Sequence, residues 1–138
     1  MNADQRGLIQ GGLTDRIIGV FFDVYNELGH GFLESVYEEA MSVALAESGM
    51  AVERQVPVRV FFRGSAVGEF RAVTVVSRTV LLEYKAARAI DAAHEKQLLN
   101  YLRATAIEVG LLLNFGVKPE FKRFVYENAR KQIRVYPR

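Results

Sequence analysis

The chain has 138 residues and contains no cysteine. A disulfide framework, a thiolate metal site and a cysteine nucleophile are therefore excluded, and nothing in the sequence points to an oxidising compartment. Long hydrophobic runs are also absent, since none approaches the roughly 18 to 20 residues that a membrane span needs. We therefore expect a cytoplasmic protein without a membrane partner.

The first residues, MNADQRGLIQGG, are too polar to form a signal peptide. We expect a flexible lead-in over residues 1–13 and a single domain over residues 14–138. Half of the residues are hydrophobic and 25% are charged, which is the composition of one compact domain with its own core. The sequence has no internal repeat, which argues against a repeat architecture.

Positive charge is concentrated near the C-terminal end of the sequence. The net charge is only +2, which permits contact with a polyanion but does not require it. The basic residues of the last fifth of the chain are Lys118, Lys122, Arg123, Arg130, Lys131, Arg134 and Arg138. They fit either a phosphate-binding surface or an ordinary solvated face, and the sequence leaves both interpretations open.

The spacing of apolar residues predicts an α/β domain. Apolar residues at intervals of three and four indicate helices, and alternating or short continuous apolar runs indicate strands. A glycine turn between two runs predicts a hairpin, and a strand, a crossover helix and a further strand predict a parallel pair in a mixed sheet covered by helices on both faces. The expected helices span residues 15–28, 33–47 and 92–107, and the expected strands span residues 52–64, 66–76, 80–87, 108–116 and 121–127.

Three finer expectations concern single elements. Thr14 or Asp15 is placed to cap the first helix. The strand over residues 121–127 alternates in polarity and is expected at the edge of the sheet, where it is able to pair with a second copy, so a homodimer is left open. The apolar spacing of the second helix predicts that its buried face consists of Val36, Tyr37, Ala40, Val43 and Ala44.

The strand VLLEYKAA over residues 80–87 carries two charges inside an apolar run. Side chains alternate between the two faces of a strand, so Glu83 and Lys85 must lie side by side on one face. A buried charge costs several kcal/mol unless it is compensated, reaches solvent or serves chemistry. The pair therefore indicates either a structural ion pair or a chemical site.

The helix that follows carries a polar stripe. In HEKQLLNYL, His94, Gln97 and Tyr101 lie at positions i, i+3 and i+7, and leucines occupy the other side. The helix begins near the end of the strand that contains Glu83 and Lys85, and ligands gather at that end of strands in open sheets. Gln97 and Tyr101 are thus candidate site residues, although packing and capping explain them about as well.

Five segments together resemble a known family. GFLESVYEEA contains Gly31, Glu34 and Tyr37 in the pattern GxxExxY, and ERQVPV, LLEYKA, HEKQLLNYLRAT and EVGLLLNFG follow in the same order. With these segments the chain resembles the bacterial GxxExxY family of PDDEXK nuclease-like proteins, and the resemblance runs over about residues 17–125. The resemblance implies a restriction-endonuclease-like core, in which a helix precedes a three-stranded antiparallel meander and a crossover helix leads to the remaining strands.

The same resemblance implies roles for single residues. Glu83 would be a metal carboxylate, and Lys85 would position the attacking water. Gln97 and Tyr101 match the Q-x-x-x-Y element that lies beside the site in an exonuclease branch, and Glu34 corresponds to an acidic residue of the first helix that completes the metal environment. Mg²⁺ or Mn²⁺ would then be the cofactor, since both prefer hard oxygen ligands, and nucleic acid would be the partner.

One position departs from the family pattern. The second strand of the family reads close to YRADLLV, whereas this chain has FRAVTVV, so Val73 stands where the metal-binding aspartate is expected. Glu69 has the same parity but lies four residues away, about 13 Å along a strand. Loss of one carboxylate should weaken Mg²⁺ binding steeply.

Three interpretations of Val73 remain open from the sequence. The chain is a degenerate member that is weakly active or inactive and serves as a nucleic-acid-binding or protein-interaction module, in which case it needs no metal. Alternatively, it is an active Mg²⁺-dependent nuclease that uses Glu34, Glu83 and Lys85. The third interpretation is that an aspartate was replaced at this position to silence the protein. The first is the one we expect, because function is argued from the site and this site lacks one member.

Overall fold

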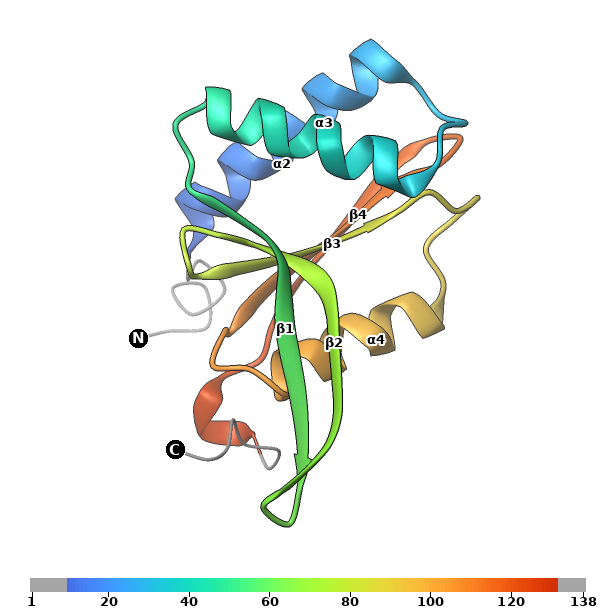
Figure 1. Ribbon diagram of the computed structural model, residues 1–138. Coiled ribbons are helices and arrows are strands. Elements are labelled where there is room, and N and C mark those ends of the chain that lie inside the picture. The colour runs from blue at the N-terminus through green and yellow to red at the C-terminus, as the bar shows by residue number, and fades with distance from the viewer. Residues whose placement is uncertain (1–9, 132–138) are drawn as a thin grey trace.

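The computed structural model describes residues 10–131, so residues 1–9 of the expected lead-in and residues 132–138 lie outside the described part of the chain. Figure 1 shows a sheet with helices on both of its faces. Its elements are α2 (Gly11–Leu28), α3 (Glu34–Glu47), β1 (Val52–Phe62), β2 (Ser65–Val76), β3 (Val80–Lys85), α4 (Ala92–Arg103), β4 (Val109–Phe115), β5 (Pro119–Val125) and the short 3₁₀ helix η1 (Asn128–Arg130).

The five-stranded sheet has the order β1-β2-β3-β4-β5. β3 and β4 are parallel and are connected through α4, whereas the other neighbours are antiparallel. The predicted order of elements, the meander and the parallel pair are thus confirmed, and β5 lies at an edge as expected. Pairing of β5 with a second copy stays a prediction. In the described part of the chain, no helix is both long and apolar enough to cross a membrane.

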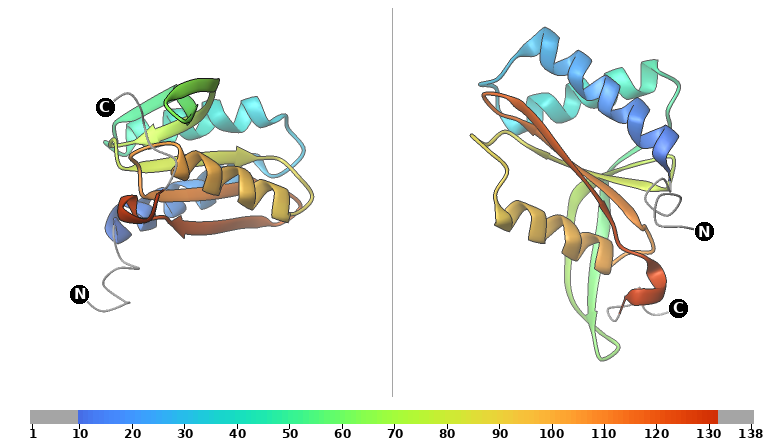
Figure 2. Two further views of the ribbon diagram at one scale, coloured as in Figure 1. Left: turned by 90° about the horizontal axis from the view of Figure 1, so that it is seen from below. Right: turned by 180° about the vertical axis from the view of Figure 1, so that it is seen from behind.

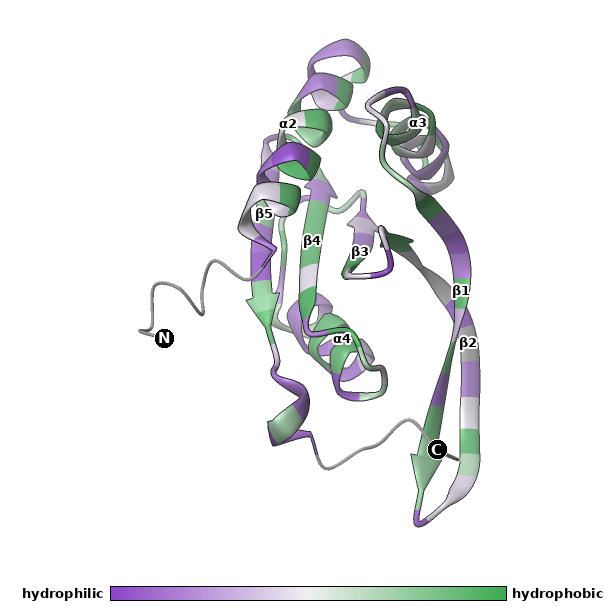
Figure 3. Ribbon diagram, turned by 90° about the vertical axis from the view of Figure 1, so that its left-hand side faces the viewer, coloured by the Kyte–Doolittle hydropathy of each residue, from purple (hydrophilic) through white to green (hydrophobic). Residues whose placement is uncertain are grey.

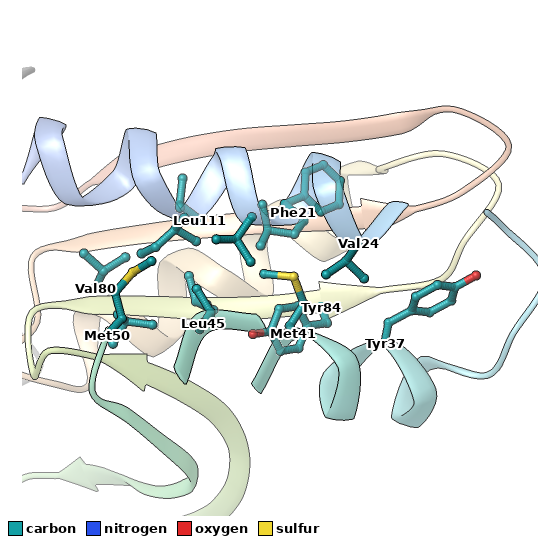
Figure 4. Packing of buried hydrophobic residues seen from close by; sticks show 14 of the residues in the cluster. Phe21, Val24, Tyr37, Met41, Leu45, Met50, Val80, Tyr84 and Leu111 are labelled. Atoms are coloured by element: carbon teal, nitrogen blue, oxygen red, sulfur yellow. The ribbon is translucent and has the colours of Figure 1, made fainter. Parts of the chain in front are cut away.

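The sheet separates two hydrophobic cores. α2 and α3 pack on one face together with Val80, Leu82 and Tyr84 of β3, and the labelled side chains of this core are shown in Figure 4. α4 packs on the other face, where Leu81 of β3 is buried. The alternation predicted for β3 is therefore confirmed, and the view from behind in Figure 2 shows the same three layers.

Two helix ends differ from the sequence-based expectation. α2 begins at Gly11, its N-cap Gln10 makes no side-chain capping bond, and the Thr14 hydroxyl inside the helix donates to Gly11 O at 3.0 Å. The cap predicted at Thr14 or Asp15 is therefore wrong. α4 ends at Arg103 instead of continuing to residue 107.

The segment after α4 is stabilised by a contact from far along the chain. The buried Lys131 ammonium donates to the carbonyl oxygens of Thr105 and Ile107, both at 2.8 Å. These bonds satisfy carbonyl groups that a longer helix would have bonded internally. Sequence spacing carries no signal for such a contact, because Lys131 is distant in the chain.

The buried face of α3 agrees only in part with the expectation, since Tyr37, Ala40 and Ala44 pack on the core as predicted. Tyr37, Met41 and Leu45 are fully buried, whereas Val36 and Val43 are 38% and 57% exposed. Apolar residues occur on more than one side of this helix, so its spacing alone does not select the face that packs. The row at 37, 41 and 45 is selected because it meets α2 and β3.

β1 and β2 form a long hairpin whose outer part reaches beyond the other strands (Figure 3). Its two-residue turn has Arg63 and Gly64 at φ 52° and 83°, as a type I′ turn requires. β2 pairs with β1 from Ser65 to Val76 but with β3 only over residues 74–76. The sheet therefore opens at the end of that short ladder. We call the outer part of the hairpin, residues 56–73, the arm.

Candidate functional site

Glu83 and Lys85 lie where the sheet opens. Both follow the last recorded β2–β3 pair, Thr74 with Leu82, and both still pair with β4 on the other side. Lys85 Nζ lies 3.6 Å from Glu83 Oε1, and both side chains are largely buried. The side-by-side arrangement predicted from strand geometry is confirmed.

α4 brings a third polar side chain to this pair. The Lys85 ammonium donates to Gln97 Oε1 at 2.9 Å. Tyr101, one turn further along α4, is buried, and its pKa is raised by burial first and by the Glu83 charge second. Glu83, Lys85, Gln97 and Tyr101 are thus brought together, and we call them the Glu83–Lys85 site.

His94, the first residue of the predicted polar stripe, has a different role. Asp91 N donates to His94 Nδ1 at 3.2 Å, and His94 N donates to Asp91 Oδ1 at 3.0 Å. This reciprocal pair is a capping arrangement that satisfies free N–H groups at the start of α4. His94 therefore fixes where α4 begins and, through it, where Gln97 lies.

The environment of Glu83 favours its neutral form. Burial raises the pKa of the Glu83 carboxyl from 4.5 to about 7, and the Lys85 ammonium lowers it only in part. The carboxylates of Glu34 and Glu38 raise it further. Glu83 Oε2 is buried and has no hydrogen-bond partner among the described residues, so one oxygen of this carboxyl is available to a ligand.

α3 approaches the site from the other face of the sheet. Glu34 acts on Glu83 electrostatically from an exposed position at the start of α3. Glu38, which sequence reasoning missed, acts on Glu83 in the same way and accepts hydrogen bonds from Arg54 Nε and Nη2 at 3.2 and 3.1 Å. Its position four residues after Glu34 was the available signal, because i and i+4 share a helix face.

The other residues of the GxxExxY pattern have structural roles. Gly31 has φ 107°, a backbone conformation that side chains rarely adopt. The Tyr37 hydroxyl donates to Gly29 O at 2.6 Å and accepts from Phe32 N at 3.2 Å. Its ring stacks on Phe115 with centroids 4.2 Å apart. The pattern therefore positions the start of α3, which carries Glu34.

The chain after Lys85 is fixed by the end of β4. Ala87 N donates to Asn114 Oδ1 at 2.9 Å, and Asn114 Nδ2 donates to Ala87 O at 3.0 Å. Asn114 is fully buried and pairs with Lys85 across the parallel ladder. A Cβ at Gly116 would lie 2.4 Å from Ala87 O. Asn114 and Gly116 thus hold the backbone on which Lys85 lies.

Position 73 lies in β2, next to this opening. Its backbone pairs with Val56 of β1, one residue before the β2–β3 ladder begins at Thr74. The side chain of Val73 lies outside the described part of the structure. Glu69, the acidic residue of β2, lies on the arm and pairs with Arg59 at 2.9 Å.

The side chains that the structure describes do not form a complete metal site. Among the described residues, no three His, Cys, Asp or Glu side chains are grouped as metal ligands. Glu83 Oε2 fits one ligand position because it is buried and unpartnered. Mg²⁺ needs about six oxygen ligands in near-octahedral geometry, and one buried carboxylate with an exposed Glu34 does not hold it as a resident ion.

A comparison with protein-family models agrees with the fold described above. The family model described as the PD-(D/E)XK nuclease superfamily matches residues 12–124. The chain therefore belongs to the PD-(D/E)XK nuclease superfamily, and its mixed α/β fold is that of the restriction-endonuclease-like proteins. Comparisons with curated proteins and with solved structures gave no match.

Proposed function

We propose that this protein is a nucleic-acid-associated PDDEXK domain of the GxxExxY type whose metal site is degenerate, so that it is weakly active or inactive as a nuclease. One observation carries the proposal. The Glu83–Lys85 site is retained at the opening of the sheet, but the grouped carboxylates that a metal requires are missing from the described residues. In the family pattern, a metal-binding aspartate is expected at the position that Val73 occupies in β2, which accounts for the missing carboxylate.

The retained charges support a continuing role in binding. A buried glutamate with a pKa near 7 destabilises the folded chain at neutral pH, and an apolar residue would remove that cost. Lys85 at the opening of the sheet offers a cation to a phosphate, and a nucleic acid backbone supplies phosphates. The GxxExxY proteins that the chain resembles are bacterial, so a cytoplasmic role in bacteria belongs to the same proposal.

A second candidate function is an active Mg²⁺- or Mn²⁺-dependent nuclease that uses Glu34, Glu83 and Lys85. The unpartnered Glu83 Oε2 and the electrostatic effect of Glu34 on Glu83 favour it. In that case the phosphate of the substrate would have to supply part of the metal environment. A protein-interaction role without nucleic acid is the remaining alternative.

The test is Val73→Asp, with Val73→Asn as a control of the same shape without the charge. We expect no Mg²⁺ signal by calorimetry and no cleavage for the natural sequence, and both should appear in Val73→Asp but not in Val73→Asn. The added carboxylate acts by supplying the second anionic ligand. Labelled DNA and RNA, each single- and double-stranded, serve as substrates with Mg²⁺ or Mn²⁺.

Two results would decide against the proposal. Metal-dependent cleavage by the natural sequence that disappears in Lys85→Ala would establish the second candidate function. Nucleic-acid binding that is absent even at low salt would leave a protein-interaction role, because phosphate contacts are strongest when few counterions compete.

A further inference from the structure

A groove lies between α4 and the arm, beside the Glu83–Lys85 site. Its volume is about 760 Å³, and its walls are one face of α4 and Val60 of β1. Gln97 and Tyr101 line the groove and also belong to the site. The groove, which we call the arm groove, therefore lies next to Lys85, which donates to the Gln97 side chain.

The lining of the arm groove combines apolar surface with positive charge. Val60, Ala93 and Ala104 supply aliphatic surface, and Lys96 and Arg103 supply two cations. No carboxylate is found among the described residues that line it. The Arg103 guanidinium donates to Asn100 Oδ1 at 3.0 Å, which holds the cation at the groove with one of its five N–H donors.

The basic run near the C-terminus is a weaker candidate for binding an anion. Lys122 pairs with Glu95 at 2.7 Å, and the Asp15 carboxylate acts on Arg123. Lys131 is buried against backbone carbonyl groups. A groove with two cations and no carboxylate in its described lining is the better match for a phosphate.

We propose that the arm groove binds one unpaired nucleotide of a single-stranded nucleic acid. The base lies against the aliphatic surface, and its phosphate lies at Lys96 and Arg103. The inference rests on the proposed function, because the strand would continue from the groove to Lys85. A single strand is required since a duplex keeps its base faces stacked inside, so no base face is free to lie against the aliphatic surface.

The test uses fluorescence anisotropy with a short labelled oligodeoxythymidylate and with a duplex of the same length. Ala93→Phe fills part of the groove, and Ala129→Phe adds the same group at an exposed position of η1. Lys96→Gln removes a groove cation, and Lys118→Gln removes an exposed cation elsewhere. Thermal melting shows whether each variant is folded, and Ala93→Leu is the smaller replacement if Ala93→Phe does not fold.

The two groove variants should act differently. Ala93→Phe should weaken single-strand binding at least about fivefold and leave the salt dependence unchanged, since it removes base contact only. A plot of log affinity against log salt has a negative slope. Lys96→Gln should make this slope less steep by about 0.7, as expected for the loss of one phosphate contact with a single strand. Neither Ala129→Phe nor Lys118→Gln should change the affinity.

Contrary outcomes separate this inference from the proposed function. Equal affinity for duplex and single strand, with no effect of Ala93→Phe, would contradict nucleotide binding in the arm groove. The proposed function would not be affected by this result. An effect of Lys118→Gln as large as that of Lys96→Gln also overturns it, because binding would then lie on the C-terminal basic surface. Absence of binding to both probes at low salt overturns both proposals.

Discussion

The Lys85 ammonium donates a hydrogen bond of 2.9 Å to the side-chain oxygen of Gln97. This contact joins β3, which carries the acid, to α4, which carries the polar stripe. It gives the Glu83–Lys85 site a fixed geometry, because Lys85 also lies 3.6 Å from Glu83. Each residue of this short network thus limits the position of the next.

The first prediction concerns the energy of the Lys85–Gln97 contact. A double-mutant cycle with Lys85→Met and Gln97→Leu should give a coupling energy of about 1 kcal/mol in urea unfolding, since hydrogen bonds to charged groups contribute more than neutral ones and this one is partly exposed. The control cycle pairs Gln97→Leu with Lys118→Met, and its effects should add. If the effects of Lys85→Met and Gln97→Leu add within about 0.3 kcal/mol, the contact contributes no measurable coupling energy to stability.

The second prediction is a pH dependence of stability that arises from Glu83. Its pKa is raised from 4.5 to about 7 by burial, so the folded state binds more protons than the unfolded state between these values. The free energy of unfolding should therefore fall as the pH rises from 4.5 through 7. Glu83→Gln should remove about 1 to 3 kcal/mol of this fall, because its side chain does not ionise.

Urea unfolding at several pH values between 4.5 and 8 measures this effect. Glu47→Gln is the matched control, because it makes the same substitution at an exposed position. Parallel curves for the natural sequence and Glu83→Gln would mean that the Glu83 carboxyl is not desolvated in solution.

The third prediction contrasts two glycines. Gly116→Ala would place its Cβ 2.4 Å from Ala87 O, and because that atom is backbone, the strand end must shift at a cost of about 3 kcal/mol. Gly19→Ala lies within α2 with nothing within 4 Å of the added carbon, and it should stabilise the chain by about 1 kcal/mol. Thermal unfolding measures both, and a Gly116→Ala variant as stable as the natural sequence would contradict the close approach.

The order of the elements and the two faces of β3 were accessible from the sequence because each follows from local backbone geometry. Strand side chains alternate regardless of what surrounds them, so Glu83 and Lys85 had to lie together. The buried face of α3 was only partly accessible. Val36 and Val43 are as apolar as a core residue, and only packing against α2 and β3 selects Met41 and Leu45 instead.

The candidate site divides in the same way. Glu83, Lys85, Gln97 and Tyr101 were named from spacing within two consecutive elements, which the chain itself keeps close. The effect of Glu38 on Glu83 was missed, and it was not foreseen that Glu34 acts on Glu83 electrostatically from an exposed position. The positions of Glu34 and Glu38 relative to Glu83 depend on how α3 crosses the sheet. The sequence alone determined which side chains of β3 and α4 lie together, since strand alternation and helix periodicity are local properties. The tertiary structure decided which of them are desolvated and where the arm groove opens, because burial and electrostatic effects depend on segments that are distant in the chain.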